Sequence, residues 1–378
     1  LIAAVEEERF SRIKHAKKAR VDNADELPIN AINYCLKEAR INLKDVDYIG
    51  FSFNPEKRLK NINIDKHFVR GDWGSKNGEE LFYWTVKNVI EKLNKLAGQD
   101  VTNKFHWIDH HLGHAASAFF VSPFKEAAIL SIDGIGEFTT TWMGYGKENK
   151  INALKEIGYP NSLGFLWEKM SKFLGFNEYD SAKVMGLSAF GDWTRYYLKF
   201  KEIVKIKDNG EFEINNDILK FRLDDFETME DFFWVKKLDN FNNRTQQHDD
   251  IAAALQKITE HVVLHIIKYL AEKTNFENIC LAGGVTLNCV ANQKILEKNF
   301  FRNIYIQPAA HDAGTALGAA YYIWNNILNK ERNFVMQHAF WGPAYTNYEI
   351  EKELRKSELD YQKIEDIEDD QETGNGKE

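Results

Sequence analysis

The sequence predicts an α/β protein with two lobes. Two observations lead to this prediction: the chain is long enough for two cores, and short apolar strands alternate with amphipathic helices in two successive stretches. With 378 residues and 44% hydrophobic side chains, the chain can bury one large core or two ordinary ones, and usual domain sizes favour two. The alternation of strands and helices is typical of a sheet covered by helices.

The first stretch begins with an apolar run from Leu1 to Val5, which resembles the second strand of a hairpin. A helix is predicted from Pro28 to Arg40, because apolar residues recur there at helical spacing and proline suits a first turn. A short strand, Tyr48 to Phe53, precedes one long helix whose apolar stripe runs from Phe82 to Leu93. A second strand, Phe105 to Ile108, leads into HHLGHAASAFF, which we interpret as a loop entering a helix.

The second stretch opens with three strands in succession, at hairpin distances from one another. These strands are predicted over residues 128–132, 138–145 and 151–158. Helices and strands then alternate. The predicted helices cover residues 162–174, 251–272 and 313–328, with another after Asn288, and the predicted strands cover residues 278–282 and 303–306.

In both stretches, strands are followed by alternating helices and strands. A pattern that occurs twice in this way is typical of a duplicated ribonuclease-H-like unit, as in the actin-like and sugar-kinase superfamily. On this pattern residues 1–125 make the first lobe and residues 126–335 the second. Periodicity alone supports only the α/β class with two lobes. Ligands of such sheets bind where strand ends and helix starts converge. The loops to search are those after Ile108, Ile132, Leu281 and Ile306.

Composition excludes several classes of partner. There are 49 basic and 57 acidic residues, and the basic ones are scattered, which argues against nucleic acid as a partner. The three cysteines form no CxxC pair, so the sequence suggests neither a disulfide framework nor a thiolate zinc site. No apolar run is long enough to cross a membrane. These observations favour a cytoplasmic protein.

A metal site is the sharpest prediction. His110 and His114 stand four residues apart at a helix entry, where both imidazoles can reach one ion; histidines that only bond backbone or water are the alternative. Asp133 and Asp312 each lie beyond an apolar strand, among small residues, although Asp312 also suits a helix cap. Two histidines with one or two carboxylates suit iron(II), or else zinc or manganese.

Two glycine-rich turns form a second candidate site. Gly134 and Gly136 can bend the backbone so that its amides approach phosphate oxygens, although a simple hairpin turn would look alike. Gly283 and Gly284 join a buried strand to a helix, and Asn288 follows as a source of amide contacts or as a cap. Neither GxGxxG nor GxxxxGK[ST] occurs at these places, so a Rossmann or P-loop site is not predicted.

Two further residues are weaker candidates for catalysis. Lys183 stands in a turn where it could hold a phosphate, and Asp250 stands at a helix start where it could accept a proton from an alcohol. A solvated lysine and a helix cap are the common alternatives.

Six blocks, in order along the chain, resemble the O-carbamoyltransferases of nodulation-factor, cephamycin and aminoglycoside biosynthesis. They are EERFSRIKH (Glu7 to His15), DHHLGHAASAFF (Asp109 to Phe120), SIDGIGE (Ser131 to Glu137), KVMGLSAFG (Lys183 to Gly191), LAGGVTLNCVAN (Leu281 to Asn292) and AAHDAGTALGAA (Ala309 to Ala320). The related enzymes that make threonylcarbamoyladenosine in tRNA share the HxxxH and the distal aspartate, but lack the EERFSR opening and the LNCVAN form.

The resemblance implies a function and a site. It implies an actin-like domain that moves a carbamoyl group from carbamoyl adenylate, made from carbamoyl phosphate and ATP, to a hydroxyl of a natural product or sugar. The two histidines and two aspartates match the family's iron ligands, and the five glycine and asparagine positions fall where it binds the adenylate. It also implies a first strand before Leu1, and it makes residues 336–378 the start of a linker to an adenylate-forming domain.

The alternative class is a non-catalytic actin-like module that binds nucleotide and metal and regulates or scaffolds a partner. A metalloprotease ranks last, because HHLGH lacks the glutamate base of HExxH, and Leu112 and Gly113 cannot act as a base. The acceptor and the oligomeric state stay open, and a homodimer is one candidate assembly.

Overall fold

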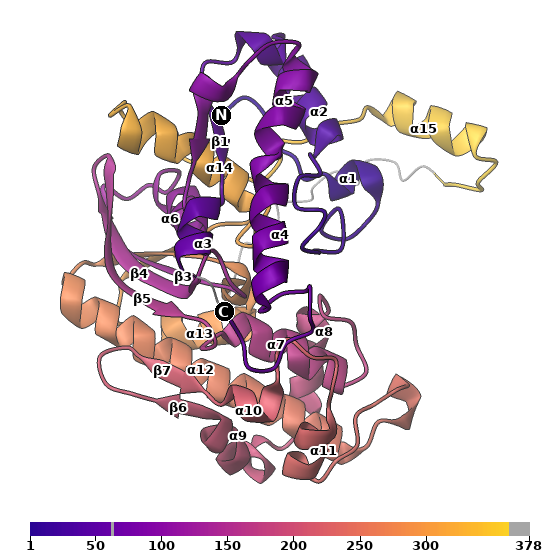
Figure 1. Ribbon diagram of the computed structural model, residues 1–378, viewed down its shortest axis with the longest axis vertical. Helices are drawn as coiled ribbons and strands as arrows, with labels where there is room; N and C mark the ends of the chain where they lie inside the picture. Colours follow the sequence, from indigo (N-terminus) through magenta and orange to yellow (C-terminus); the bar gives the residue numbers. More distant parts are fainter. Residues whose placement is uncertain (62–63, 363–378) are drawn as a thin grey trace, which may run out of the picture. The chain divides into compact units, whose positions relative to one another are not determined.

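A computed structural model describes residues 1–61 and 64–362 of the chain (Figure 1). Residues 1–340 form one compact unit, and residues 341–378 form a second that contains helix α15 (Asn347–Lys356). The acidic stretch from Glu365 to Glu372, interpreted as part of a linker, lies outside the described residues. Within the described part, no helix is both long and apolar enough to cross a bilayer.

A five-stranded mixed sheet forms the centre of the larger unit, in the order β5-β4-β3-β8-β9. Strand β3 pairs antiparallel with β4, which pairs antiparallel with β5, while β3, β8 and β9 are parallel. The strands are β3 (Glu126–Ile132), β4 (Thr139–Lys147), β5 (Lys150–Gly158), β8 (Asn278–Ala282) and β9 (Asn303–Ile306). The α/β class and all five predicted strands are confirmed, with ends that differ by at most two residues.

Helices cover both faces of this sheet, with α6 and α12 on opposite sides (Figure 1). Successive side chains of a strand point to opposite faces, so Ile129 packs toward α6 (His110–Phe119), whereas Leu130 packs toward α7 (Leu163–Phe173) and α12 (Gln246–Thr274). Because both faces are buried, β3 is almost uniformly apolar rather than alternating.

The first half of the chain contains a smaller parallel sheet of β1 (Ile49–Phe51) and β2 (Phe105–Trp107). The single long helix predicted beside it is two helices, α4 (Lys76–Lys87) and α5 (Val89–Ala97). Between them, the Asn88 side chain donates to the Asp25 carboxylate at 2.6 Å. The predicted apolar stripe thus serves two cores, one around Phe82 and Val86 and the other around Val89 and Leu93.

Two other predictions differ from the structure. Leu1 to Val5 is not a strand, because no strand in the described ranges pairs with it. The predicted last helix is α14 (Gly314–Tyr321), which continues as a π-helical segment over Tyr322–Ile327. The remaining elements are α1 (Glu8–Ser11), α2 (Ile29–Ala39), α3 (Pro55–Lys60), α8 (Ser181–Leu187), α9 (Tyr197–Ile203), α10 (Asn216–Leu219), α11 (Glu227–Phe233), α13 (Cys289–Lys298), β6 (Val204–Ile206) and β7 (Phe212–Ile214).

Candidate metal centre

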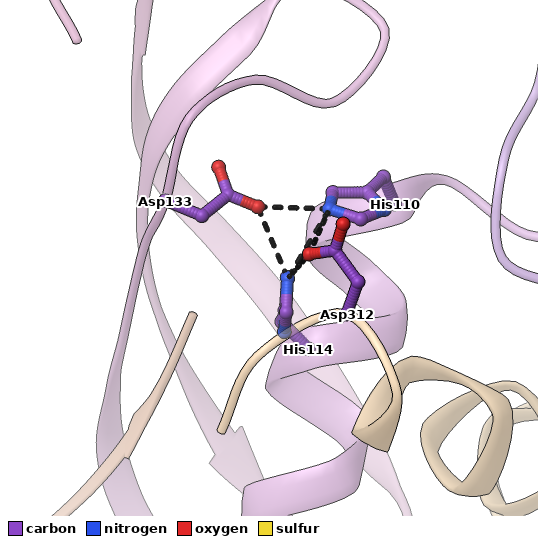
Figure 2. A group of neighbouring side chains, drawn as sticks. All are labelled: His110, His114, Asp133 and Asp312. Carbon is purple, nitrogen blue, oxygen red and sulfur yellow. Dashed lines mark hydrogen bonds and ion pairs between the residues drawn. The ribbon is translucent and has the colours of Figure 1, made fainter. Parts of the chain in front are cut away.

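Four side chains from three distant segments converge beside the central sheet (Figure 2). His110 and His114 lie one turn apart on α6, Asp133 follows β3, and Asp312 lies in the loop before α14. One ligand atom from each residue lies within 4.8 Å of the other three. The convergence predicted from the HxxxH spacing and the two strand-end aspartates is therefore present in the structure.

The distances suit a single shared ion. Asp133 Oδ2 lies 2.8 Å from His110 Nε2 and 3.1 Å from His114 Nε2, and the two imidazole nitrogens are 3.2 Å apart. Asp312 Oδ1 lies 3.6 and 3.5 Å from the same nitrogens. Atoms bound about 2.1 Å from one ion, at angles of about 90° to 110°, stand roughly 3.0–3.4 Å apart.

Tautomers and charge also favour a cation here. His110 Nδ1 lies 3.2 Å from the Ser52 carbonyl oxygen, which can only accept, so Nδ1 carries a hydrogen. Neutral His110 therefore turns its Nε2 lone pair toward the cluster, and protonated His110 donates from Nε2 to Asp133. Burial opposes protonation of His110, but its hydrogen bond to Asp133 and the nearby negative charge outweigh burial and raise its pKa. A metal-free cluster that attracts a proton so strongly has the charge to hold a metal ion.

The cluster is closed on three sides and open on the fourth. His110, His114 and Asp133 are buried, whereas the Asp312 side chain is 76% exposed. An ion bound here could therefore be reached by a substrate from the Asp312 side. Catalytic metal sites keep such an open position, while structural sites are closed by protein ligands.

Glu137 fixes the start of α6. Its carboxylate accepts the backbone N–H of His110 at 3.0 and 3.2 Å and that of Asn54 at 2.7 Å. Burial raises the pKa of Glu137, mainly because the carboxyl group is removed from water. This contact explains why the helix begins at His110 itself, where a loop was expected: a carboxylate from beyond β3 satisfies a free N–H of its first turn.

A buried ion pair holds the loop after Asp133. Arg58 of α3 pairs with Glu79 of α4 through two hydrogen bonds of 2.7 and 2.8 Å. The same guanidinium donates to the carbonyl oxygens of Gly136 and Glu137 at 3.2 and 3.0 Å. The first half of the chain thereby positions a loop of the second half next to the four converging side chains.

His111 supports Asp133 from behind. Its Nε2 donates to the Thr139 carbonyl oxygen at 2.9 Å and lies 3.2 Å from Asp133 Oδ1. Burial opposes ionisation of Asp133, but the nearby His111 and the hydrogen bonds of His110 and His114 outweigh it and hold the pKa of Asp133 well below its usual range. Sequence reasoning missed His111 and Glu137, although both stand inside the blocks HHLGH and DGIGE.

The predicted nucleotide-binding glycines lie in the loops around this cluster. The Gly136 N–H donates to Thr139 O at 2.8 Å, and the Gly283 N–H to Ala310 O at 2.7 Å. Gly283 needs its glycine, because its φ is +87° and a Cβ would lie 2.2 Å from Ile132 O. The Gly134 carbonyl accepts from Ser162 at 2.6 Å, and only Gly284 faces open space.

The Asn288 side chain is held by hydrogen bonds within the protein. Its side-chain oxygen accepts the Ala291 N–H at 2.9 Å, which caps α13, and its amide donates to Gln256 at 2.8 Å. The nucleotide-binding role of Asn288 and the four glycines stays a prediction.

The two predicted catalytic residues contact groups outside the cluster of four side chains. Lys183 of α8 is exposed and pairs with Asp180 at 3.1 Å. The Asp250 carboxylate is fully buried at the start of α12, where it accepts from Asp192 N at 2.8 Å and pairs with Arg195 at 3.2 Å. The metal cluster includes neither residue. Both catalytic roles stay predictions.

Residues 1–321 match the family described as "Carbamoyltransferase N-terminus", and the chain belongs to this family. An uncharacterized protein of Synechocystis is 36% identical over 97% of this chain and 62% of its own length. Nodulation protein NolNO of Sinorhizobium fredii is 33% identical over 94% of this chain and 49% of its own length. The chain thus spans about half to three-fifths of these relatives.

Solved structures give a weaker likeness. Component A of (R)-2-hydroxyglutaryl-CoA dehydratase from Acidaminococcus fermentans aligns with a TM-score of 0.41 and 14% identity, covering 78% of this chain and 82% of that one. HypF of T. kodakarensis aligns with a TM-score of 0.37 and 13% identity, covering 78% of this chain and 42% of HypF.

Proposed function

We propose that this chain performs the transfer step of an O-carbamoyltransferase, in which a carbamoyl group passes from carbamoyl adenylate to an acceptor hydroxyl. One observation carries the proposal: two imidazoles and two carboxylates converge within 4.8 Å, and the group is open on the Asp312 side. Family membership supports carbamoyl transfer as the reaction class.

A bound divalent ion would supply a Lewis acid that polarises the carbamoyl carbonyl and stabilises its developing negative charge. His110, His114, Asp133 and Asp312 would hold that ion, and Fe(II) is the proposed metal, because two histidines with carboxylates and open positions suit it. The glycine loops after β3 and β8 would hold the adenylate.

The family resemblance and the strand order support the proposed donor source, acceptor and fold. Carbamoyl phosphate and ATP would be the sources of the adenylate, and a natural product or sugar the acceptor. The strand order of the central sheet, with two antiparallel pairs followed by two parallel ones, supports a ribonuclease-H-like second lobe. A duplicated fold, a cytoplasmic location and a homodimer are proposed with it.

The test combines metal analysis with a transfer assay. Protein treated with a chelator and then reloaded with Fe(II) is given synthetic carbamoyl adenylate, and AMP release and the carbamoylated product are measured. His114→Ala should lose both the bound ion and the transfer, while His106→Ala, which removes an imidazole from β2 outside the cluster, should keep both. Full transfer by His114→Ala would refute the proposal. Nucleotide and metal binding without transfer by the wild-type protein would favour the regulatory or scaffolding module instead.

A further inference from the structure

Ser52 and Thr315 join the two halves of the chain through a hydrogen bond. Their hydroxyl oxygens lie 2.6 Å apart, although the two residues are 263 positions apart in the sequence. Ser52 directly follows β1, and Thr315 lies in the first turn of α14. The strand packs closely on this helix, because a Cβ at Gly50 would lie 3.0 Å from Ala319 Cβ. Residues two apart on a strand or four apart on a helix share a face, so Ser52 and Thr315 continue the same contact.

Each residue of this pair is also bonded to a member of the cluster. The Thr315 hydroxyl donates to the Asp312 carbonyl oxygen at 2.6 Å, and the Thr315 N–H donates to the same oxygen at 3.0 Å. Because that bond uses its only hydrogen, the Thr315 hydroxyl accepts from Ser52. The Ser52 carbonyl oxygen in turn accepts the Nδ1 hydrogen of His110 at 3.2 Å. The two hydroxyl residues therefore connect the backbone of Asp312 with the ring of His110.

The pair also lies against the helix that carries both imidazoles. A Cβ at Gly113 of α6 would be 3.2 Å from Ser52 Cβ and 3.3 Å from Thr315 Cβ, so both side chains contact the backbone beside His114. The exposed Asp312 side chain is restrained little by packing, and the hydrogen bonds to its backbone decide where it stands. Groups that bond to metal ligands in this way orient them, and losing one weakens metal binding about 10- to 100-fold.

We propose that Ser52 and Thr315 are positioning residues of the metal centre, which hold Asp312 and His110 at the separation that one shared ion requires. Neither hydroxyl belongs to the group of converging ligand atoms, so both act through the residues they bond. Through Ser52, the first half of the chain fixes the place of a ligand that the second half supplies. The inference rests on one part of the proposed function, the binding of a divalent ion by the cluster, and does not depend on the reaction.

The experiment titrates chelator-treated protein with Fe(II) and compares the dissociation constants of variants. Thr315→Val replaces the hydroxyl with a methyl group and should weaken Fe(II) binding about 10- to 100-fold. Thr315→Ser keeps the hydroxyl and should retain the wild-type affinity. Thr274→Val removes a hydroxyl that donates to the Leu270 carbonyl oxygen at 2.8 Å near the end of α12, and should leave Fe(II) binding unchanged. Urea unfolding without metal checks that each variant is folded.

A double variant tests whether the two hydroxyls act through their shared bond. Ser52→Ala alone should weaken Fe(II) binding, but in the Thr315→Val protein, where that bond is already lost, it should weaken binding no further. If Thr315→Val binds Fe(II) as tightly as the wild type, or if the two fold-changes multiply, the positioning role is overturned and the proposed function stands. If the wild-type protein binds no divalent ion, the metal centre of the proposed function is itself overturned.

Discussion

Gly318 of α14 packs directly onto Gly113 of α6. A Cβ at Gly318 would lie 1.8 Å from the Gly113 carbonyl oxygen, a distance that no side chain can occupy. Helix α6 carries His110 and His114, and the loop that leads into α14 carries Asp312. This glycine contact therefore sets how closely Asp312 approaches the two imidazoles, although neither glycine touches the ion site itself.

Gly318→Ala should push α14 away from α6 and weaken metal binding. We expect a loss of stability of about 1–3 kcal/mol, as for other overpacked cores, together with a weaker affinity for Fe(II). Urea unfolding and metal titration measure the two effects. Gly186→Ala on α8, where a Cβ would meet open space, is the matched control and should leave metal affinity unchanged. Equal metal affinity in both variants would contradict a link between the packing of α14 on α6 and metal binding.

Metal affinity should rise with pH. In the metal-free cluster, Asp133 raises the pKa of His110, so a proton competes with the ion, while Asp133 itself stays ionised because its own pKa is held low. Displacing one proton makes binding up to about tenfold tighter per pH unit. Calorimetry in two buffers of different ionisation enthalpy should detect the released proton between pH 6 and 8. A pH-independent affinity without proton release would show that the histidine is already neutral.

Arg58→Met should destabilise the protein strongly. It leaves the buried Glu79 carboxylate without its partner and releases the carbonyl oxygens of Gly136 and Glu137, so we expect a cost of about 3–5 kcal/mol. Adding Glu79→Leu should restore part of this loss. Lys76→Met breaks an exposed pair with Glu80 and should cost at most about 0.5 kcal/mol. Urea unfolding of the wild type and the three variants checks the order.

Glu168→Gln should stabilise the metal-free protein at high pH. The folded-state pKa of Glu168, about 8, lies above its ordinary 4.5, so ionising it opposes folding. This penalty is absent below about pH 4.5 and complete above about pH 8. We expect the variant to exceed wild type by on the order of 2 kcal/mol at pH 8.5, since partial access to water reduces the full effect. Denaturant unfolding in the presence of a chelator should show no difference at pH 5; a pH-independent difference would argue against the raised pKa.

The sequence by itself determined the strands of the central sheet and the four side chains that converge in the candidate metal centre. Strands such as β3 carry their own signal, because a strand buried on both faces is a run of apolar residues. The imidazole pair is also local, since His110 and His114 share one helical face through their spacing alone. Asp133 and Asp312 could be chosen because strand ends with small residues gather at one edge of a sheet.

Only the tertiary structure decided which groups surround the cluster. Glu137 starts α6 from 27 residues away, and Arg58 reaches Glu137 across 79 positions, so neither contact follows a periodic pattern. Glu168 and Asp250 are both acidic residues on helices, and they differ only in what faces them: one lies beside a bare glycine without a partner, and the other is held by an arginine. Burial and charge from distant segments set the pKa of a carboxylate, and these exist only once the chain has folded.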